Sequence, residues 1–272
     1  MEPVNREAYG ATADKLVEFA RDADAARVMT VADEVLAVAD LLRRERRLRR
    51  VLSDPARSGT DRRELLRTVL SGKIGEDALD LLGTLVSARW TTPGALLTAV
   101  ERLGVDALLT GADRAGELAD LEDELFRFSQ IVSGDNRLAA ALGDSSADVA
   151  RRAELLRDLL DGKVKPATLR LAQLALAGFG GRGLTASLIR MVELAAAKRD
   201  QSVAYVTSAV PLTDADEQRL AGRLSEMYGR DVAVKIDVDP KIIGGMRVKV
   251  GSDLYDGTIA RRLAEARTAF AK

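Results

Sequence analysis

Few side chains in this sequence could support covalent or acid–base chemistry, because its 272 residues include no cysteine and no histidine. Thiol nucleophiles, disulfides, zinc sites with Cys or His ligands and Ser-His-Asp triads are therefore excluded. Carboxylates and lysines remain, and they gather in two places: Asp253 and Asp256 near Lys249, and Asp237 and Asp239 near Lys241. Both groups lie beside predicted turns, where Asp is favoured for its hydrogen bonds to backbone amides. Their spacing predicts no desolvated pocket, so we expect no catalytic residue, no metal site and no cofactor.

A glycine-rich segment, Gly178-Phe-Gly-Gly-Arg-Gly183, has the three-glycine spacing of a dinucleotide-binding loop. Such a loop must connect a strand to a helix whose N-terminus receives the pyrophosphate. The residues before it, 169–177, follow a helical pattern instead. We therefore interpret this segment as a plain connector between two helices.

Arginines are concentrated on either side of Leu48, in what the pattern predicts to be one helix: Arg43, Arg44, Arg46, Arg47, Arg49 and Arg50. They could form a docking face for an acidic partner or for nucleic acid. They could also be a solvated helix face whose aliphatic stems cover apolar neighbours, which we favour. The whole chain is balanced, with 41 basic and 42 acidic residues and a net charge of −1. Because nucleic-acid binders need a cationic surface, this balance argues against nucleic acid as a partner.

Helical periodicity extends through the first 200 residues. Apolar side chains recur at spacings of three, four and seven in 35–52, and comparable patterns follow at 65–70, 78–88, 95–109, 125–132, 155–160, 169–177 and 184–197. Apolar residues make up 47% of the chain but aromatic residues only 4%, which favours helices built from Ala and Leu. The polar N-terminal residues 1–7 lack the apolar core of a signal peptide, and the Leu/Ala-rich stretch 171–179 is too short to cross a bilayer. We expect a soluble cytoplasmic chain that reaches a membrane only through a partner.

The sequence also matches itself at an offset of 90 residues. Between 33–74 and 123–164 one position in three is identical, including Asp33-Glu34 with Asp123-Glu124, Leu48 with Leu138, and Glu64–Arg67 with Glu154–Arg157. Two residues further out of register, Leu96, Val100 and Glu101 match Leu188, Val192 and Glu193. A series of this kind indicates the tandem duplication of a helical module. It predicts that 33–109 and 123–199 form similar units.

The pattern changes after about residue 200. Residues 203–210, 232–238 and 246–250 are β-branched or alternate as strands do, 253–255 is a possible short strand, and 214–228 reads as a helix with Thr213 as its N-cap. A last helix is predicted over 259–270. The fold expected is mainly α, with a tandemly duplicated helical bundle module followed by a small α+β domain. The expected domain ranges are 1–110, 111–200 and 201–272.

Glycines lie at the ends of several predicted elements of this last domain. Gly244-Gly245 and Gly251 bracket a strand, where glycine usually marks a bulge or a close backbone approach. Gly257 follows Asp256 in a turn, and we expect it to take a positive φ before Thr258 caps the last helix.

The segment from Ile243 to Leu263 resembles the C-terminal signature of the ATP synthase delta family, which includes the mitochondrial oligomycin-sensitivity-conferral protein. That signature is a Gly-Gly-hydrophobic strand, a glycine, a variable stretch, and Asp-Gly-Ser/Thr leading into a helix with Arg-Leu. The matching positions are Gly244, Gly245, Val248, Gly251, Asp256, Gly257, Thr258, Ile259, Arg262 and Leu263. Residues 203–212 resemble the family's Val-x-x-Ala-x-Pro-Leu segment, and Tyr9 its first-helix Tyr-Ala motif. The chain is longer than typical members by about one helical module, as in the long forms of high-GC actinobacteria.

The resemblance implies a non-catalytic stator subunit of an F-type ATP synthase. Its helical part would bind the N-terminal helices of the alpha subunits, and residues 201–272 would bind the C-terminal end of the peripheral-stalk b subunit. The subunit would be peripheral, on the cytoplasmic face of the cell membrane. Either helical copy could take the usual N-terminal role. The alternative function is a helical adaptor that binds acidic partners or nucleic acid through Arg43–Arg50.

Overall fold

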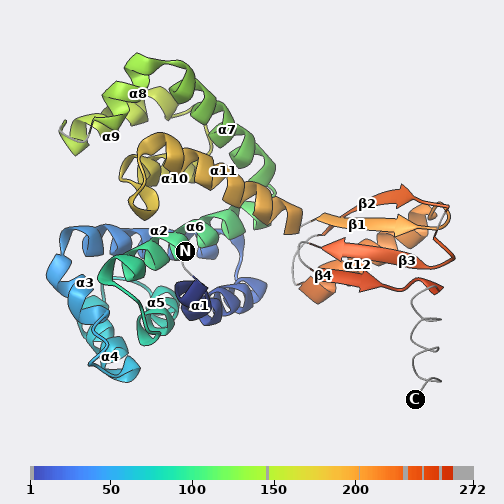
Figure 1. Cartoon of the computed structure of the whole chain (residues 1–272), viewed down its shortest axis with the longest axis horizontal. Coiled ribbons are helices and arrows are strands. Elements are labelled where there is room, and N and C mark those ends of the chain that lie inside the picture. The colour runs from blue at the N-terminus through green and yellow to red at the C-terminus, as the bar shows by residue number, and fades with distance from the viewer. Residues whose placement is uncertain are drawn as a thin grey trace. The chain divides into compact units, whose positions relative to one another are not determined.

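The computed structural model describes residues 3–144, 147–201, 203–228, 232–240, 242–250 and 253–259. The chain divides into two compact units, residues 1–195 and 196–272, coloured blue to gold and orange to red in Figure 1. The first is helical and the second carries the strands, so the expected fold class, mainly α with a small α+β domain, is confirmed. The three-part division of the chain stays a prediction.

The first unit is built from eleven described helices and one 3₁₀ turn. Their bounds are α1 Pro3–Asp22, α2 Ala25–Arg44, α3 Arg46–Leu52, α4 Gly59–Leu70, α5 Glu76–Ser87, α6 Pro93–Arg114, α7 Leu118–Gly134, α8 Asn136–Gly143, α9 Val149–Leu160, α10 Pro166–Leu176, η1 Phe179–Gly181 and α11 Leu184–Gln201, whose last turns extend past the unit boundary. One continuous core of leucine, valine and alanine side chains holds these helices together. Burial of this apolar surface is the main source of stability.

Local signals in the sequence explain where these helices begin. Ser58 and Asp61 form a capping box at the start of α4, with each side chain accepting the other residue's backbone N–H. Thr92 caps α6 by accepting the N–H of Ala95, and Pro93 occupies the first helical position, where its missing N–H costs nothing.

The second half of the helical unit repeats the first. The bounds of α9 lie 90 residues after those of α4, and α7, α8, α10 and α11 follow α2, α3, α5 and α6 in the same order. One tertiary hydrogen bond is also repeated. The Glu34 carboxylate accepts the N–H of Gly75 at 2.9 Å, and the Glu124 carboxylate accepts the N–H of Lys165 at 2.9 Å. Each bond ties one helix to the N-terminus of another at the same offset, which supports duplication of a folded module.

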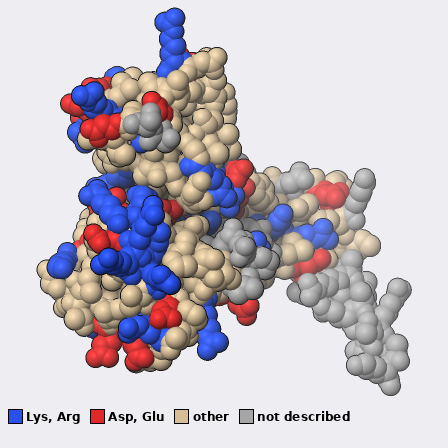
Figure 2. All heavy atoms as spheres, turned by 60° about the vertical axis from the view of Figure 1, so that its left-hand side comes forward, with Lys and Arg blue, Asp and Glu red and all other residues tan. Residues whose placement is uncertain are grey.

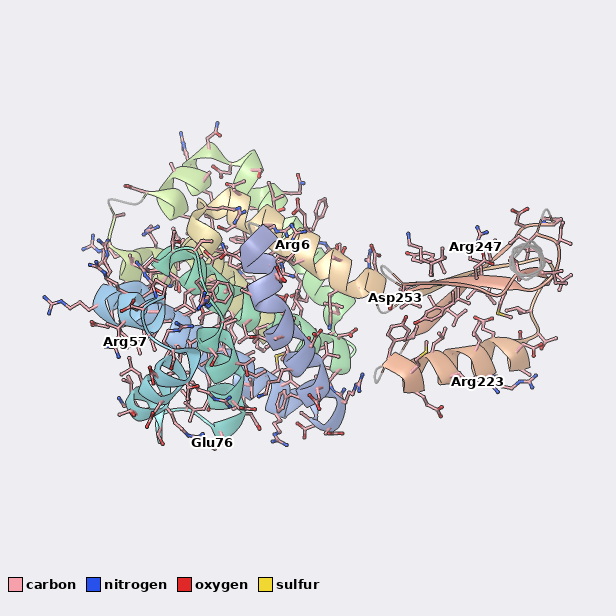
Figure 3. The ribbon with its side chains drawn as sticks, turned by 60° about the horizontal axis from the view of Figure 1, so that its bottom comes forward. Arg6, Arg57, Glu76, Arg223, Arg247 and Asp253 are labelled. Atoms are coloured by element: carbon pink, nitrogen blue, oxygen red, sulfur yellow. The ribbon has the colours of Figure 1, made fainter. Side chains whose placement is uncertain are left out.

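The second unit contains a mixed sheet with strand order β2-β1-β3-β4. Strand β1 (Val203–Ser208) is parallel to β2 (Ala233–Val238) and antiparallel to β3 (Met246–Val250), which pairs with β4 (Asp253–Asp256). Helix α12 (Asp214–Tyr228) connects β1 to β2 and lies along one face of the sheet (Figure 3). It buries Leu224 with Ala204, Val206, Val248 and Val250. The predicted helix, its Thr213 cap and all four strands are confirmed.

Candidate partner-docking sites

The arginines of 43–50 lie at a corner between two helices, so the expectation of one helix was wrong. Helix α2 ends at Arg44 and α3 begins at Arg46, with Glu45 at φ −91° and ψ 76° between them. Leu42 and Leu52 are 1% and 0% exposed. Both leucines belong to the core of the unit, one on each side of the corner.

The corner also separates these arginines into two groups. Arg43 points inward, and its guanidinium pairs with Glu101 at 2.8 Å and with Asp40 at 3.4 Å. Arg49 is partly buried and donates to the backbone carbonyl of Leu42. The others, Arg44, Arg46, Arg47 and Arg50, are exposed, and Figure 2 shows basic side chains gathered on this side of the helical unit. The candidate docking face therefore loses Arg43 and Arg49.

Glu101 is a buried residue that the sequence analysis did not identify as important. Its side chain on α6 is 2% exposed and accepts hydrogen bonds from Arg43 and from the backbone N–H of Gly180 at 2.7 Å. Gly180 belongs to the glycine-rich segment, which follows helix α10 and not a strand. Because a carboxylate of the chain already binds this N–H, the segment lacks the phosphate-binding geometry of a dinucleotide loop. The one signal for Glu101 was its match to Glu193 in the repeat.

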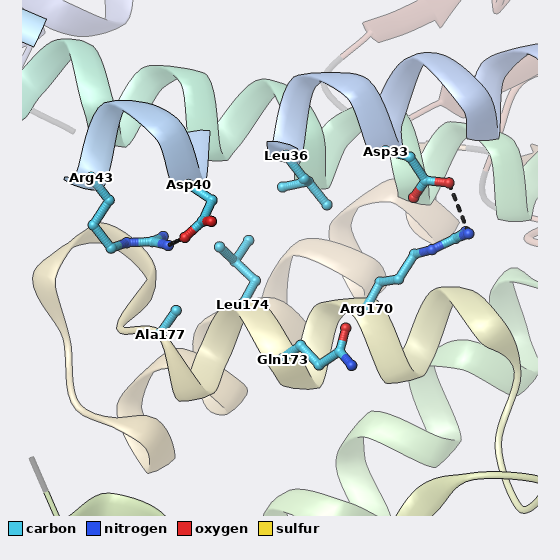
Figure 4. A pocket seen from close by; sticks show the side chains of 8 residues that line it. All are labelled: Asp33, Leu36, Asp40, Arg43, Arg170, Gln173, Leu174 and Ala177. Atoms are coloured by element: carbon cyan, nitrogen blue, oxygen red, sulfur yellow. Dashed lines mark hydrogen bonds and ion pairs between the residues drawn. The ribbon is translucent and has the colours of Figure 1, made fainter. Parts of the chain in front are cut away.

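A cleft of about 340 Å³ lies between α2 and α10 (Figure 4). Its lining is Asp33, Leu36, Asp40, Arg43, Arg170, Gln173, Leu174 and Ala177. Arg170 closes one end by pairing with Asp33 at 2.8 Å. Partial burial raises the pKa of Asp33, and the positive charge of Arg170 opposes that rise. The two halves of the repeat thus meet through a charged and apolar contact.

The two adjacent glycines of the C-terminal signature take positive φ angles, 66° at Gly244 and 81° at Gly245. A Cβ on Gly245 would lie 2.4 Å from the carbonyl oxygen of Gly257, so the expected close backbone approach is confirmed. Two hydrogen bonds hold the approach: Gly257 N–H donates to Met246 O at 3.0 Å, and Ile259 N–H donates to Gly244 O at 3.2 Å. Val248 is buried in the centre of β3.

The turn that follows β4 differs from the expectation. Gly257 is absent from the glycines with positive φ, so the prediction of a left-handed conformation there was wrong. Asp256 forms this turn with its side chain: its Oδ1 accepts the N–H of Thr258 at 3.0 Å and the hydroxyl at 2.7 Å. These bonds, with Arg247 nearby, hold the pKa of Asp256 below its usual value. Gly251, Arg262 and Leu263 lie outside the described residues.

Of the carboxylates considered for chemistry, Asp253 and Asp256 have structural partners, whereas Lys241 and the side chain of Asp237 lie outside the described part of the chain. Asp253 accepts the hydroxyl of Tyr228 at 2.9 Å, and Asp256 pairs with Arg247 at 3.4 Å. Among the described residues, no three acidic side chains are grouped to hold a metal ion. Within the same part of the chain, no helix has the length and apolarity needed to cross a membrane.

The sheet of the second unit leaves one face open within the described residues. Tyr205 on β1 stands beside Lys249 on β3, which stands beside Leu254 on β4. Tyr205 and Leu254 are 44% and 56% exposed. On the opposite face of the sheet, the alternate residues of β1 and β3 are buried against Leu224 of α12. This face offers apolar and basic side chains to a partner.

Comparison with known proteins agrees with the C-terminal signature. The pattern of the family described as ATP synthase delta (OSCP) subunit matches residues 105–270. The chain is 56% identical over 268 residues to ATP synthase subunit delta of Salinispora arenicola, with 98% of each chain covered. The chain belongs to the ATP synthase delta (OSCP) family. It is also 44% identical to ATP synthase subunit delta of Streptomyces griseus, again over 98% of both chains, and 45% identical to that of Kineococcus radiotolerans over 94% and 93%.

The comparisons bear on the extra length of the chain and on which helical copy corresponds to the family pattern. The relatives are matched over nearly their whole length, so they share the long form. The family pattern begins at residue 105, within α6, and therefore aligns with the second copy and the sheet unit. Delta subunits are non-catalytic components of ATP synthase, and the alternative of a nucleic-acid adaptor receives no support.

Proposed function

We propose that this chain is the stator clamp of a rotary ATP synthase, which joins the catalytic head to the peripheral stalk and resists the torque of the rotor. The observation that carries the proposal is full-length similarity to delta subunits in a chain with two compact units. Two separate units suit a clamp, because each can hold a different partner. The clamp would be peripheral, at the cytoplasmic face of the cell membrane.

The helical unit would bind N-terminal helices of the alpha subunits. Its Ala-rich helices allow close approach, and helix-in-groove burial of apolar side chains gives a longer-lived contact than exposed ion pairs do. The arginines at the α2–α3 corner would add attraction for acidic segments. Salt screens exposed charges, so these arginines would contribute little to the binding free energy. They would speed association with an acidic segment instead.

The sheet unit would bind the b subunit. Its open face of Tyr205, Lys249 and Leu254 combines exposed apolar groups with positive charge. Such a mixture suits an amphipathic helix with acidic flanks. The glycine approach at Gly245 fixes β3 relative to the turn after β4 and so keeps this face in register.

Removal and readdition of the chain tests the role. Membranes depleted of the chain should still hydrolyse ATP at the head, but hydrolysis should no longer pump protons, and added chain should restore pumping. The isolated chain should not hydrolyse ATP. Hydrolysis by the purified chain, lost on replacing one of its own carboxylates, would refute the proposal.

A second experiment separates the two ends. Gly245→Ala should weaken binding to a b-subunit fragment while binding to the catalytic head persists. The opposite pattern, with head binding lost and b binding unchanged, would reverse the assignment of the two units.

A further inference from the structure

The repeat exposes in its second copy a surface that is covered in its first. In the first copy this surface is the α2/α6 face, defined by Asp33 and Leu36 on α2 and by Leu97 and Glu101 on α6. Helices α2 and α6 pack against each other, and the side chain of Leu36 lies against Gly104. The second copy covers this face. Arg170 of α10 pairs with Asp33, Leu174 of α10 stands across the cleft from Leu36, and η1 donates the Gly180 N–H to Glu101.

The corresponding surface of the second copy is the α7/α11 face, defined by Asp123 and Phe126 on α7 and by Ile189 and Glu193 on α11. Asp123 and Phe126 lie 90 residues after Asp33 and Leu36, and Ile189 and Glu193 lie 92 residues after Leu97 and Glu101. The residue types are retained: each face carries two carboxylates and two large apolar side chains.

The exposure of the two faces differs sharply. Phe126 and Ile189 are 48% and 49% exposed, whereas Leu36 and Leu97 pack against the core of the unit. Glu101 is buried and accepts two hydrogen bonds, whereas Glu193 is exposed and, within the described part of the chain, pairs with its helix neighbour Arg190 at 2.6 Å. Asp123 likewise pairs with Arg127 on its own helix at 2.6 Å. Such exposed pairs contribute little and exchange readily for another cation.

An end repeat that meets only water normally presents a polar outer face. The α7/α11 face instead keeps Phe126 where the covered copy has Leu36, and Ile189 where it has Leu97. Phe126 is exposed on α7 one turn after Asp123, and exposed apolar groups beside charged ones are typical of a binding surface. The covered copy also shows what fits such a face, namely an α-helix with arginine four positions before leucine.

We propose that the α7/α11 face binds an amphipathic helix of a partner protein, which places a basic residue against Asp123 and an apolar residue, one turn later, against Phe126. The bound helix would take the position on the second copy that α10 takes on the first. This inference names one surface within the docking role proposed for the helical unit. Its test measures binding alone and does not depend on whether the chain couples rotation to synthesis.

The probe is a capped, fluorescently labelled peptide with the α10 sequence Pro166–Ala177, which already binds the equivalent face within the chain. Its anisotropy should rise saturably when full-length chain is added at up to millimolar concentration. Phe126→Asp should weaken binding at least tenfold, and exchange of the peptide's arginine for glutamate should also weaken it. Val149→Asp is the matched control, because Val149 is 59% exposed in the same copy but lies on α9. It should leave binding unchanged.

Three results would overturn the proposal. The first is no saturable binding by the wild-type chain. The second is equal weakening by Phe126→Asp and Val149→Asp. The third is occupancy of the face by the chain itself. The sequence has no cysteine, so Phe126→Cys introduces a single reactive thiol. Maleimide should label it rapidly in the free chain and slowly with peptide present. Protection in the free chain at all concentrations would identify an intramolecular occupant, and protection that grows with chain concentration would identify a second copy.

Discussion

Replacement of Gly245 by alanine should destabilise the sheet unit while the helical unit stays folded. The backbone at Gly245 has φ 81°, a region that residues with a Cβ rarely adopt. The added Cβ would also lie 2.4 Å from the carbonyl oxygen of Gly257 and 3.0 Å from the Cα of Thr258. Both obstacles are backbone atoms of residues whose N–H groups are hydrogen-bonded, so neither can move aside as a flexible side chain would.

The expected cost has two parts. A left-handed conformation costs a residue with a Cβ about 1–2 kcal/mol. Overpacking against a fixed neighbour typically costs about 1–3 kcal/mol more. The free energy of unfolding of the sheet unit should therefore fall by about 2–5 kcal/mol, a large fraction of the stability of a small domain.

Two glycines of the same unit provide controls. Gly222, inside α12, has open space around it, so Gly222→Ala should stabilise the helix by about 0.5–1 kcal/mol. Gly257 lacks a positive φ, and its Cβ would lie 3.3 Å from Met246 O. Gly257→Ala should therefore cost less than Gly245→Ala.

Hydrogen exchange measured by mass spectrometry can follow the two units separately. Gly245→Ala should speed exchange of the β1, β3 and β4 amides, and exchange in α2 to α10 should stay unchanged. Trp90, the single tryptophan, lies in the helical unit and gives an independent thermal transition for it. Equal exchange in Gly245→Ala and Gly222→Ala would refute the reasoning from φ and close approach.

Three further predictions concern buried and charged groups. Glu124→Ala should lower the free energy of unfolding in urea more than Glu34→Ala, by about 1–3 kcal/mol against about 1, because Glu124 also accepts the Thr168 hydroxyl at 2.6 Å. Arg62 is 2% exposed and donates to five backbone carbonyls, so Arg62→Met should cost about 3 kcal/mol or more, whereas exposed Arg63→Met should cost under about 1. The pKa of Asp256 is lower in the folded chain, so its contribution to the stability of the sheet unit should be present above about pH 4 and be lost as the pH falls through the folded pKa. Hydrogen exchange in β4 should speed up over this pH range, and Asp256→Asn should abolish this pH dependence.

Much of the local structure followed from the sequence. Apolar periodicity and caps predicted the helices, alternation predicted the strands, and the offset of 90 residues predicted two similar helical halves. Helix α12 has the bounds that its Thr213 cap and apolar stripe indicated, and β3 has those that its alternation indicated. These features depend on residues close together in the chain, so they leave a direct trace in the order of residue types.

Only the tertiary structure decided which arginines, glutamates and glycines make contacts that the fold depends on. The arginines of 43–50 separate into an inward pair, Arg43 and Arg49, and an exposed group, because the chain turns at Glu45 between α2 and α3. Glu101 looked ordinary in its helix until Gly180, far along the chain, approached it. Position 245 has no room for a Cβ because the carbonyl oxygen of Gly257, on another segment, lies against it. The sequence determined the elements, whereas contacts between distant segments determined burial, strain and the open α7/α11 face, because these depend on which surfaces meet.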